Sequence, residues 1–256
     1  MVRLSANLGF LWPDRPLPER IDAAAAAGFE AVEFHYPYDV PAELVAERCR
    51  AGGVRALQVN TVMGDRARGE FGLAAIPGRE AGFRAQFEQA ASYARTIGAG
   101  AVHILAGITE GMDTGAAEDA YLENIRHAAA AAPDLTLMLE PMNRRDRPGY
   151  FCADVEHAAD LVRRSGVGNL KILFDVYHVG VAQGDVLTRL RRHLPLIGHV
   201  QIAAVPSRAE PDEGEIAYRA VFAELERLGY DGWVGCEYIP RAGTDEGLAW
   251  RGRLLG

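Results

Sequence analysis

The chain has 256 residues, of which 49% are hydrophobic and 24% are charged, proportions typical of a globular protein rather than a disordered or fibrous one. Its 27 Lys and Arg residues stand against 35 Asp and Glu residues, so the formal net charge is -8. An acidic chain without a basic stripe repels phosphate backbones. We therefore expect no nucleic-acid partner.

Cysteine usage and apolar runs indicate the compartment. Cys49, Cys152 and Cys236 lie far apart and form no CxxC pair, which suits a reducing environment. No stretch approaches the ~18–20 apolar residues of a transmembrane span, and the first ten residues resemble a strand rather than a signal peptide. We expect a cytoplasmic protein with no membrane partner.

Short apolar runs typical of strands alternate with helix-like segments along the whole chain. The predicted strands lie at residues 2–8, 30–35, 54–60, 101–106, 135–140, 170–175, 197–202 and 232–237. The predicted helices lie at residues 17–27, 41–51, 79–97, 116–131, 153–165, 183–194, 215–228 and 244–254. Eight such units predict an α/β fold, a single (β/α)₈ TIM barrel with one domain spanning residues 1–256.

Glycine positions support these boundaries and bear on the alternative fold. Gly28, Gly98 and Gly229 each follow a helical run, where a left-handed residue is favoured. An open doubly wound sheet would more often show a glycine-rich phosphate turn after its first strand. The sequence has neither GxGxxG nor a Walker A motif, so we expect no nucleotide cofactor.

Polar residues follow otherwise apolar runs at the ends of the later strands. Glu140 ends the fifth strand, Asp175 ends the sixth, Gln201 lies in the seventh, and Glu237 ends the eighth. Because barrel sites lie at the carboxyl ends of the strands, four consecutive strands direct an oxygen ligand to one place. The alternative is that each acid caps a helix or forms a surface ion pair.

Three carboxylates and one amide form a hard, oxygen-rich ligand set, which suits Mg²⁺ or Mn²⁺. Without a cation, converging carboxylates would repel one another and at least one would be protonated. Zinc is disfavoured because no cysteine or close histidine pair accompanies the acids. We therefore expect a divalent metal at this site.

Histidines give a weaker signal near the same strand ends. His178 follows Asp175 by three residues and is placed to orient a metal-bound carboxylate from the second shell. His199 precedes Gln201 by two residues and so shares its strand face. A single histidine of this kind is more often a hydrogen-bonded barrel residue than a ligand. The same applies to two others in or near strand ends, His35 and His103.

Two loops, residues 61–78 and 203–214, exceed the usual length of a βα loop, and long loops often bind ligands. Arg208 in the second loop is a candidate to hold an anionic substrate group through a bidentate pair, although a loop arginine is usually solvated. Glu70 in the first loop joins His178, His199 and Arg208 as a second-shell or substrate-binding candidate.

Several motifs are familiar as a set. They include SANLGF, GFEAVEFHYPYD, GLAAIPGRE, LEPMN, NLKILFDVYH, GHVQIAAVPSRAEPDEGEI and GWVGCEYIPR. Together they resemble the hydroxypyruvate isomerase family of xylose isomerase-like TIM barrels, including the related 2-oxo-tetronate isomerases. The resemblance runs over nearly the whole chain.

The resemblance implies a divalent metal held by Glu140, Asp175, Gln201 and Glu237, with Glu140 and Glu237 as the acid/base pair. It implies an aldose–ketose type isomerase of a small hydroxy-oxo acid, such as hydroxypyruvate to 2-hydroxy-3-oxopropanoate (tartronate semialdehyde), by enediolate proton transfer. Hydroxy-oxo acids are therefore the expected small-molecule partners. A homodimer or higher homo-oligomer is compatible with the sequence.

Other functions are ranked below this one. A 2-oxo-tetronate isomerase would use the same chemistry on a four-carbon acid, and HVQIAAVPSRAEPDEGEI is at least as similar to that branch. A keto-sugar 3-epimerase would use a similar metal and glutamate pair on a polyol. An endonuclease IV-like phosphodiesterase would need a His-rich site and a basic surface. A non-catalytic sugar-acid binding protein would be expected to lack at least one ligand position.

Overall fold

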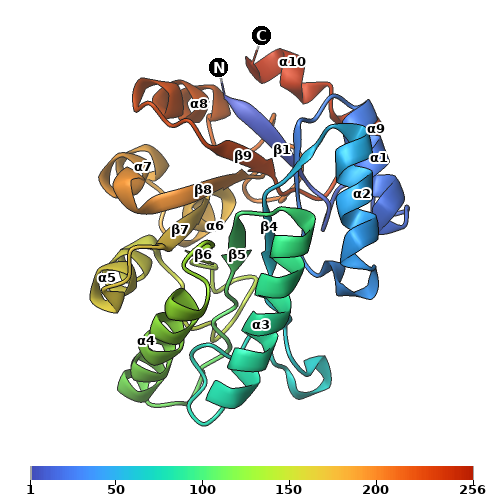
Figure 1. Cartoon of the computed structure of the whole chain (residues 1–256). Helices are drawn as coiled ribbons and strands as arrows, with labels where there is room; N and C mark the ends of the chain where they lie inside the picture. The colour runs from blue at the N-terminus through green and yellow to red at the C-terminus, as the bar shows by residue number, and fades with distance from the viewer. Residues whose placement is uncertain (1, 256) are drawn as a thin grey trace.

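Parallel strands form the centre of the molecule, and helices surround them (Figure 1). The structure is a computed structural model that describes residues 2–255. Its strands are β1 (Arg3–Asn7), β2 (Ala31–Glu33), β3 (Arg55–Ala56), β4 (Gln58–Asn60), β5 (Ala101–His103), β6 (Thr136–Leu139), β7 (Leu170–Asp175), β8 (Ile197–Ile202) and β9 (Trp233–Cys236). Each predicted strand is present.

The strands pair in the order β3-β2-β1-β9-β8-β7-β6-β5-β4, and every pair is parallel. Backbone hydrogen bonds also join β4, at one end of this order, to the residues that directly follow β2, near the other end. The Phe34 N–H donates to the Gln58 carbonyl at 3.1 Å, and the Asn60 N–H donates to the His35 carbonyl at 3.0 Å. The sheet therefore closes on itself, as the predicted TIM barrel requires.

The helices cover the outside of this barrel. They are α1 (Leu17–Ala26), α2 (Ala42–Gly52), α3 (Glu80–Ile97), α4 (Thr114–Ala131), α5 (Val155–Ser165), α6 (Val176–Ala182), α7 (Val186–His193), α8 (Tyr218–Arg227), α9 (Thr244–Gly247) and α10 (Trp250–Leu255). In α3, Phe83, Phe87, Ala90 and Ala94 recur at helical spacing and are all buried. This apolar stripe packs the helix against the sheet, so the core lies between the two layers.

Short side chains and glycines fix several helix ends. The Asp113 carboxylate accepts a hydrogen bond from the Ala116 N–H at 2.8 Å at the start of α4. Such an N-cap satisfies an N–H that has no partner within the helix. The glycines expected after helices, Gly28, Gly98 and Gly229, have φ values of 79°, 74° and 71°. Their left-handed conformation confirms that prediction.

The structure differs from the sequence prediction at three elements. The third predicted strand is divided into β3 and β4, but Leu57 between them still bonds to Val32 on one side and Ala101 on the other. Helix α6 was not predicted, because its seven residues are too few for a clear helical period. The last predicted helix is interrupted between α9 and α10.

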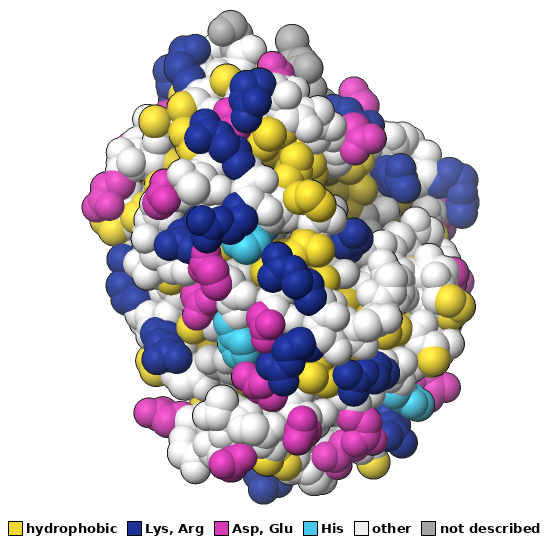
Figure 2. All heavy atoms as spheres, turned by 90° about the vertical axis from the view of Figure 1, so that its left-hand side faces the viewer, with side chains coloured by type: hydrophobic (Ala, Val, Ile, Leu, Met, Phe, Trp, Pro, Cys, Tyr) yellow, Lys and Arg dark blue, Asp and Glu magenta, His cyan; other side chains and the backbone are white. Residues whose placement is uncertain are grey.

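Charge is distributed without a strong bias on the face that carries α4, α5, α7 and α8. Figure 2 shows acidic and basic side chains interspersed there. Over the described part of that face, no continuous basic surface is visible. Within residues 2–255, none of the helices combines the length and the apolar character that crossing a membrane requires.

Trp250 gives a stability prediction. Its side chain is fully buried, its indole N–H donates to the Tyr238 hydroxyl at 3.1 Å, and the two rings meet edge to face. Because Trp250→Ala leaves a large cavity, we expect a loss of about 3–5 kcal/mol in the free energy of unfolding, measured by denaturant titration. Ile239→Ala, at a side chain that is 51% exposed, should change it by less than ~0.5 kcal/mol. Equal losses of unfolding free energy in the two variants would contradict the role of Trp250 in the core.

Candidate active site

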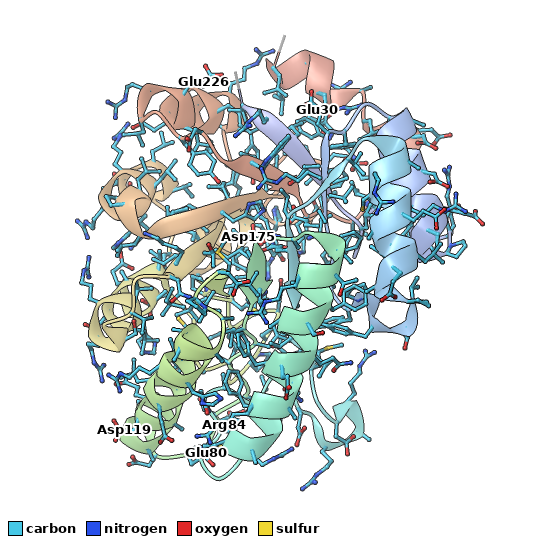
Figure 3. The ribbon with its side chains drawn as sticks, viewed as in Figure 1. Glu30, Glu80, Arg84, Asp119, Asp175 and Glu226 are labelled. Atoms are coloured by element: carbon cyan, nitrogen blue, oxygen red, sulfur yellow. The ribbon has the colours of Figure 1, made fainter. Side chains whose placement is uncertain are left out.

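The four predicted ligands lie at the carboxyl ends of four neighbouring strands. Glu140 directly follows β6, Asp175 ends β7, Gln201 lies in β8 and Glu237 directly follows β9. Asp175 and Gln201 are register partners across β7 and β8. All four are at most 5% exposed. In Figure 3, Asp175 lies at the centre of the barrel, whereas Asp119 lies on an outer helix. The alternative of surface ion pairs does not apply to these side chains.

Glu140, Asp175 and His178 form a compact cluster, with one ligand atom from each lying within 4.8 Å of the others. Helix α6 positions two of its members. Asp175 is the N-cap of this helix and accepts a hydrogen bond from the Tyr177 N–H through Oδ1 at 2.8 Å. His178 lies in the first turn, and its Nε2 is 3.7 Å from both Glu140 Oε1 and Asp175 Oδ2.

Three buried oxygens at this site have no hydrogen-bond donor among the described residues: Glu140 Oε1, Asp175 Oδ2 and Gln201 Oε1. A buried acceptor without a partner loses its hydration and gains nothing in return. All three are carboxylate or amide oxygens, the ligands that hard divalent cations prefer. The donor set therefore fits a divalent metal.

The electrostatics of the cluster point the same way. Burial, with repulsion from Glu237 and Asp175, holds the pKa of Glu140 well above its usual range. Burial and repulsion from Glu237 raise the pKa of Asp175 to about 7. Both shifts reflect the cost of burying negative charges close together, and a bound cation would offset that cost.

Glu237 differs from its neighbours because both of its oxygens have partners. His35 Nε2 lies 2.7 Å from Oε1, and the Asn7 side chain donates to the same oxygen at 3.3 Å. An Arg208 guanidinium nitrogen lies 3.4 Å from Oε2. Burial alone would raise the pKa of Glu237, but the His35 hydrogen bond and the Arg208 charge outweigh it and lower the pKa to about 2.

Hydrogen bonds to His178 define its tautomer. Its Nδ1 accepts a hydrogen bond from the Asn143 backbone N–H at 3.1 Å, so this nitrogen carries no proton. Burial, with the nearby Arg208 charge, lowers the pKa of His178 to about 3, so the ring is neutral. Its proton is therefore on Nε2, the nitrogen that faces Glu140 and Asp175. In this state the protonated Nε2 faces the two carboxylates, but at 3.7 Å it is too far away to form a hydrogen bond with either.

Arg208 lies within the site rather than in solvent. Its side chain is 18% exposed, and a guanidinium nitrogen lies 4.0 Å from Asp175 Oδ2. The guanidinium also packs over the rings of Phe10 and Tyr177, each at 4.9 Å. Its buried Nε has no hydrogen-bond partner among the described residues. The positive charge and this free donor both favour an anionic ligand nearby.

The other two candidates make different contacts. His199 Nε2 lies 3.1 Å from Glu33 Oε2 inside the barrel, rather than beside the three unpaired oxygens. The Glu70 carboxylate accepts a hydrogen bond from the Asp65 N–H at 2.8 Å and pairs with Arg79. These contacts shape the loop at residues 61–78. The structure therefore brings His178 to Glu140 and Asp175, and Arg208 to Asp175 and Glu237, whereas His199 and Glu70 contact other residues.

The sequence matches the family described as "Xylose isomerase-like TIM barrel" over residues 21–254, most of its length. The chain belongs to this family. Its closed barrel of parallel strands, with polar residues at their carboxyl ends, agrees with the xylose isomerase-like family fold.

Curated relatives match the chain over nearly its full length. The chain is 45% identical over 259 residues to the 2-oxo-tetronate isomerase of Cupriavidus necator, and the match covers 100% of both chains. It is 38% identical over 253 residues to the hydroxypyruvate isomerase of Escherichia coli, covering 98% of each. A crystal structure of a Brucella melitensis protein named AP endonuclease, family 2, shares 42% identity and a TM-score of 0.96 over 99% of each chain. The isomerase relatives identify this xylose isomerase-like barrel as an isomerase.

Sequence reasoning missed several residues of this site. Asn7 ends β1 and Glu33 ends β2, so the rule that selected Glu140 and Asp175 would also have found them. Asn143 lies in the segment after β6, where nothing in the sequence marks its contact with His178. His35 was a weak candidate, and the structure places it directly on Glu237.

The raised pKa of Asp175 predicts a pH dependence in metal-free protein. Between the ordinary value of 3.8 and about 7, the unfolded chain has lost this proton while the folded protein keeps it. The stability of the folded state therefore falls as the pH rises through this window and levels off above it. Asp175→Asn removes the charge and keeps an oxygen for the Tyr177 N–H.

We expect this variant to melt at a higher temperature than the parent protein in a chelator, with a difference that grows from pH 5 to pH 7. Thermal unfolding across this range measures it. Asp119→Asn, at an exposed position on α4, is the matched control and should show no such trend. A difference that does not vary with pH would contradict the prediction.

Proposed function

We propose that this chain is a metal-dependent aldose–ketose type isomerase of a small hydroxy-oxo acid, with hydroxypyruvate as the first candidate substrate. The three unpaired oxygens of Glu140, Asp175 and Gln201 carry this proposal. These oxygens would act as cation ligands. Glu140 and Glu237 would be the two carboxylates available for proton transfer. The hydroxypyruvate and 2-oxo-tetronate isomerases among its relatives support the substrate class.

In this proposal Glu140, Asp175, Gln201 and Glu237 hold Mg²⁺ or Mn²⁺. When bound, the cation polarises the oxygen atoms of the substrate and makes the neighbouring C–H more acidic. His178 stays outside the ligand set because its Nε2 carries the proton. Its N–H would instead orient the Glu140 and Asp175 carboxylates, as outer-shell partners of metal ligands do.

Glu140 and Glu237 would transfer the proton. In hydroxypyruvate the proton leaves C3 and returns to C2, and the hydroxyl proton passes from O3 to O2, which gives 2-hydroxy-3-oxopropanoate. The surroundings shift the pKa of Glu140 upward and that of Glu237 downward. Two carboxyl groups shifted in opposite directions are typical of an acid/base pair.

Arg208 would bind the substrate carboxylate, because its buried Nε–H has no acceptor and its charge faces the site. A cavity of about 410 Å³ adjoins Glu237 through His35 and is also lined by Gly9, Tyr36 and Met63. This space is where we place the rest of the substrate. A larger hollow of about 640 Å³ beside α4 contains none of the four ligands.

His199 and Glu70 would act indirectly. His199 contacts Glu33, which in turn contacts Gln201. Glu70 would contribute through the loop that it holds in shape, which also carries Met63 at the edge of the cavity. Neither residue is proposed to touch the metal.

A 2-oxo-tetronate is the second candidate substrate, because the Cupriavidus necator relative with that name is 45% identical over its whole length. Proton NMR in deuterated buffer with Mg²⁺ tests both acids. Conversion of hydroxypyruvate to an aldehyde or its hydrate, with deuterium at C2, is the expected result. Conversion of only the four-carbon acid would retain the mechanism and change the substrate. No reaction with either acid by metal-loaded protein would overturn the proposal.

Replacing either glutamate isosterically should remove the proton transfer. We expect Glu140→Gln and Glu237→Gln each to lower kcat by about 100-fold or more, since general acid–base groups contribute on that scale. Circular dichroism should be unchanged. Glu88→Gln, on the exposed face of α3, is the matched control and should retain full activity. Turnover near the parent rate in either site variant would refute its assignment.

A further inference from the structure

A sealed carboxylate lies inside the barrel, next to the candidate metal ligands. Glu33 at the end of β2 is 0% exposed. Its Oε1 accepts a hydrogen bond from the Ser5 hydroxyl at 3.0 Å. Its Oε2 accepts from the side-chain amides of Gln58 and Gln201, both at 2.8 Å, and lies 3.1 Å from His199 Nε2.

The surroundings of Glu33 provide hydrogen-bond partners for both oxygens of its carboxylate. A buried charge is tolerated when several hydrogen bonds replace its hydration, and here four side chains from β1, β4 and β8 do so. The backbone of β9 also leaves room for this carboxylate, because Gly235 has no side chain. A Cβ at Gly235 would lie 2.0 Å from Glu33 Oε1 and 2.9 Å from Gln201 Cγ. A larger residue at this position would displace the Glu33 carboxylate.

The contact with Gln201 has a directional consequence. A glutamine amide has a donor end and an acceptor end that a rotation of about 180° exchanges. With Nε2 on the Glu33 carboxylate, Oε1 faces away from it and is one of the three unpaired oxygens. The exchanged orientation would place two acceptor oxygens against each other at 2.8 Å, where they repel.

We propose that Glu33 is a positioning residue, which holds the Gln201 amide with its oxygen directed toward the metal ligands. This inference rests on the proposed function, because it assigns Gln201 Oε1 to a cation. Glu33 also acts at longer range, since its charge contributes to the raised pKa values of Glu140 and Asp175. A test must therefore separate amide orientation from charge.

Glu33→Gln provides the first variant, because an amide facing an amide allows either orientation of Gln201. We expect its Kd for Mn²⁺ to rise by about 10–100-fold, the usual effect of losing an outer-shell partner. Electron paramagnetic resonance of free Mn²⁺ measures this without turnover. Ser5→Ala removes only the bond to Glu33 Oε1 and is the matched control. It should leave the Kd within about threefold.

A double-mutant cycle then isolates the orientation effect. In a Gln201→Ala background, Glu33→Gln should change the Kd by less than about threefold, because no amide remains to be oriented. An equal loss in both backgrounds would show that Glu33 acts through charge alone, and would overturn the proposal. At saturating Mn²⁺, kcat of the single variant should return to within about threefold of the parent value.

Two outcomes separate this inference from the proposed function. Parent protein that binds no Mn²⁺ would overturn the proposed function and, with it, the inference. If Glu33→Gln binds Mn²⁺ with the same Kd as the parent protein, the inference is overturned and the proposed function is unaffected. If Glu33→Gln does not fold, Glu33→Asp replaces it, because it withdraws the carboxylate by one methylene while keeping the charge. An unchanged Kd in that variant would equally refute the role of Glu33.

Discussion

Mutual repulsion among buried carboxylates is the constraint on which the rest of this barrel depends. Glu33, Glu140, Asp175 and Glu237 are each at most 5% exposed. The protein compensates them unequally. Glu33 receives hydrogen bonds, Glu237 receives hydrogen bonds and the Arg208 charge, and Glu140 and Asp175 are left with unpaired oxygens and raised pKa values. The uncompensated charge is therefore concentrated at one point, where a cation fits.

This unequal compensation connects the fold to the chemistry. A TIM barrel brings the ends of all its strands together, so acids far apart in the sequence become neighbours. The cost of burying these acids close together is visible in the pKa of Asp175, which burial and repulsion from Glu237 raise to about 7. Functional sites commonly store such destabilisation, because groups arranged for a ligand are not arranged for maximal stability of the free protein.

The sequence was sufficient for the barrel and for the strand-end acids, since both follow from local pattern. Alternating apolar runs define the strands, and Glu140, Asp175 and Glu237 follow them directly. Contacts across the barrel interior could not be predicted from the sequence. Glu33 meets Gln201 only because closure of the sheet brings β2 and β8 to face each other, and no spacing along the chain encodes that meeting. Helix α6 was missed for a local reason, because its seven residues are too few to show a helical period.

Asp175 holds two positions at once, as the N-cap of α6 and as a member of the acid cluster. This double use restricts how the sequence can drift. A descendant that abandoned catalysis would lose the need for a negative charge, but the first turn of α6 would still require a short side chain with an acceptor oxygen. Asn, Ser or Thr at this position would then indicate a related barrel that has lost catalysis but kept α6. A bulky apolar residue would indicate a relative in which the start of this helix has changed.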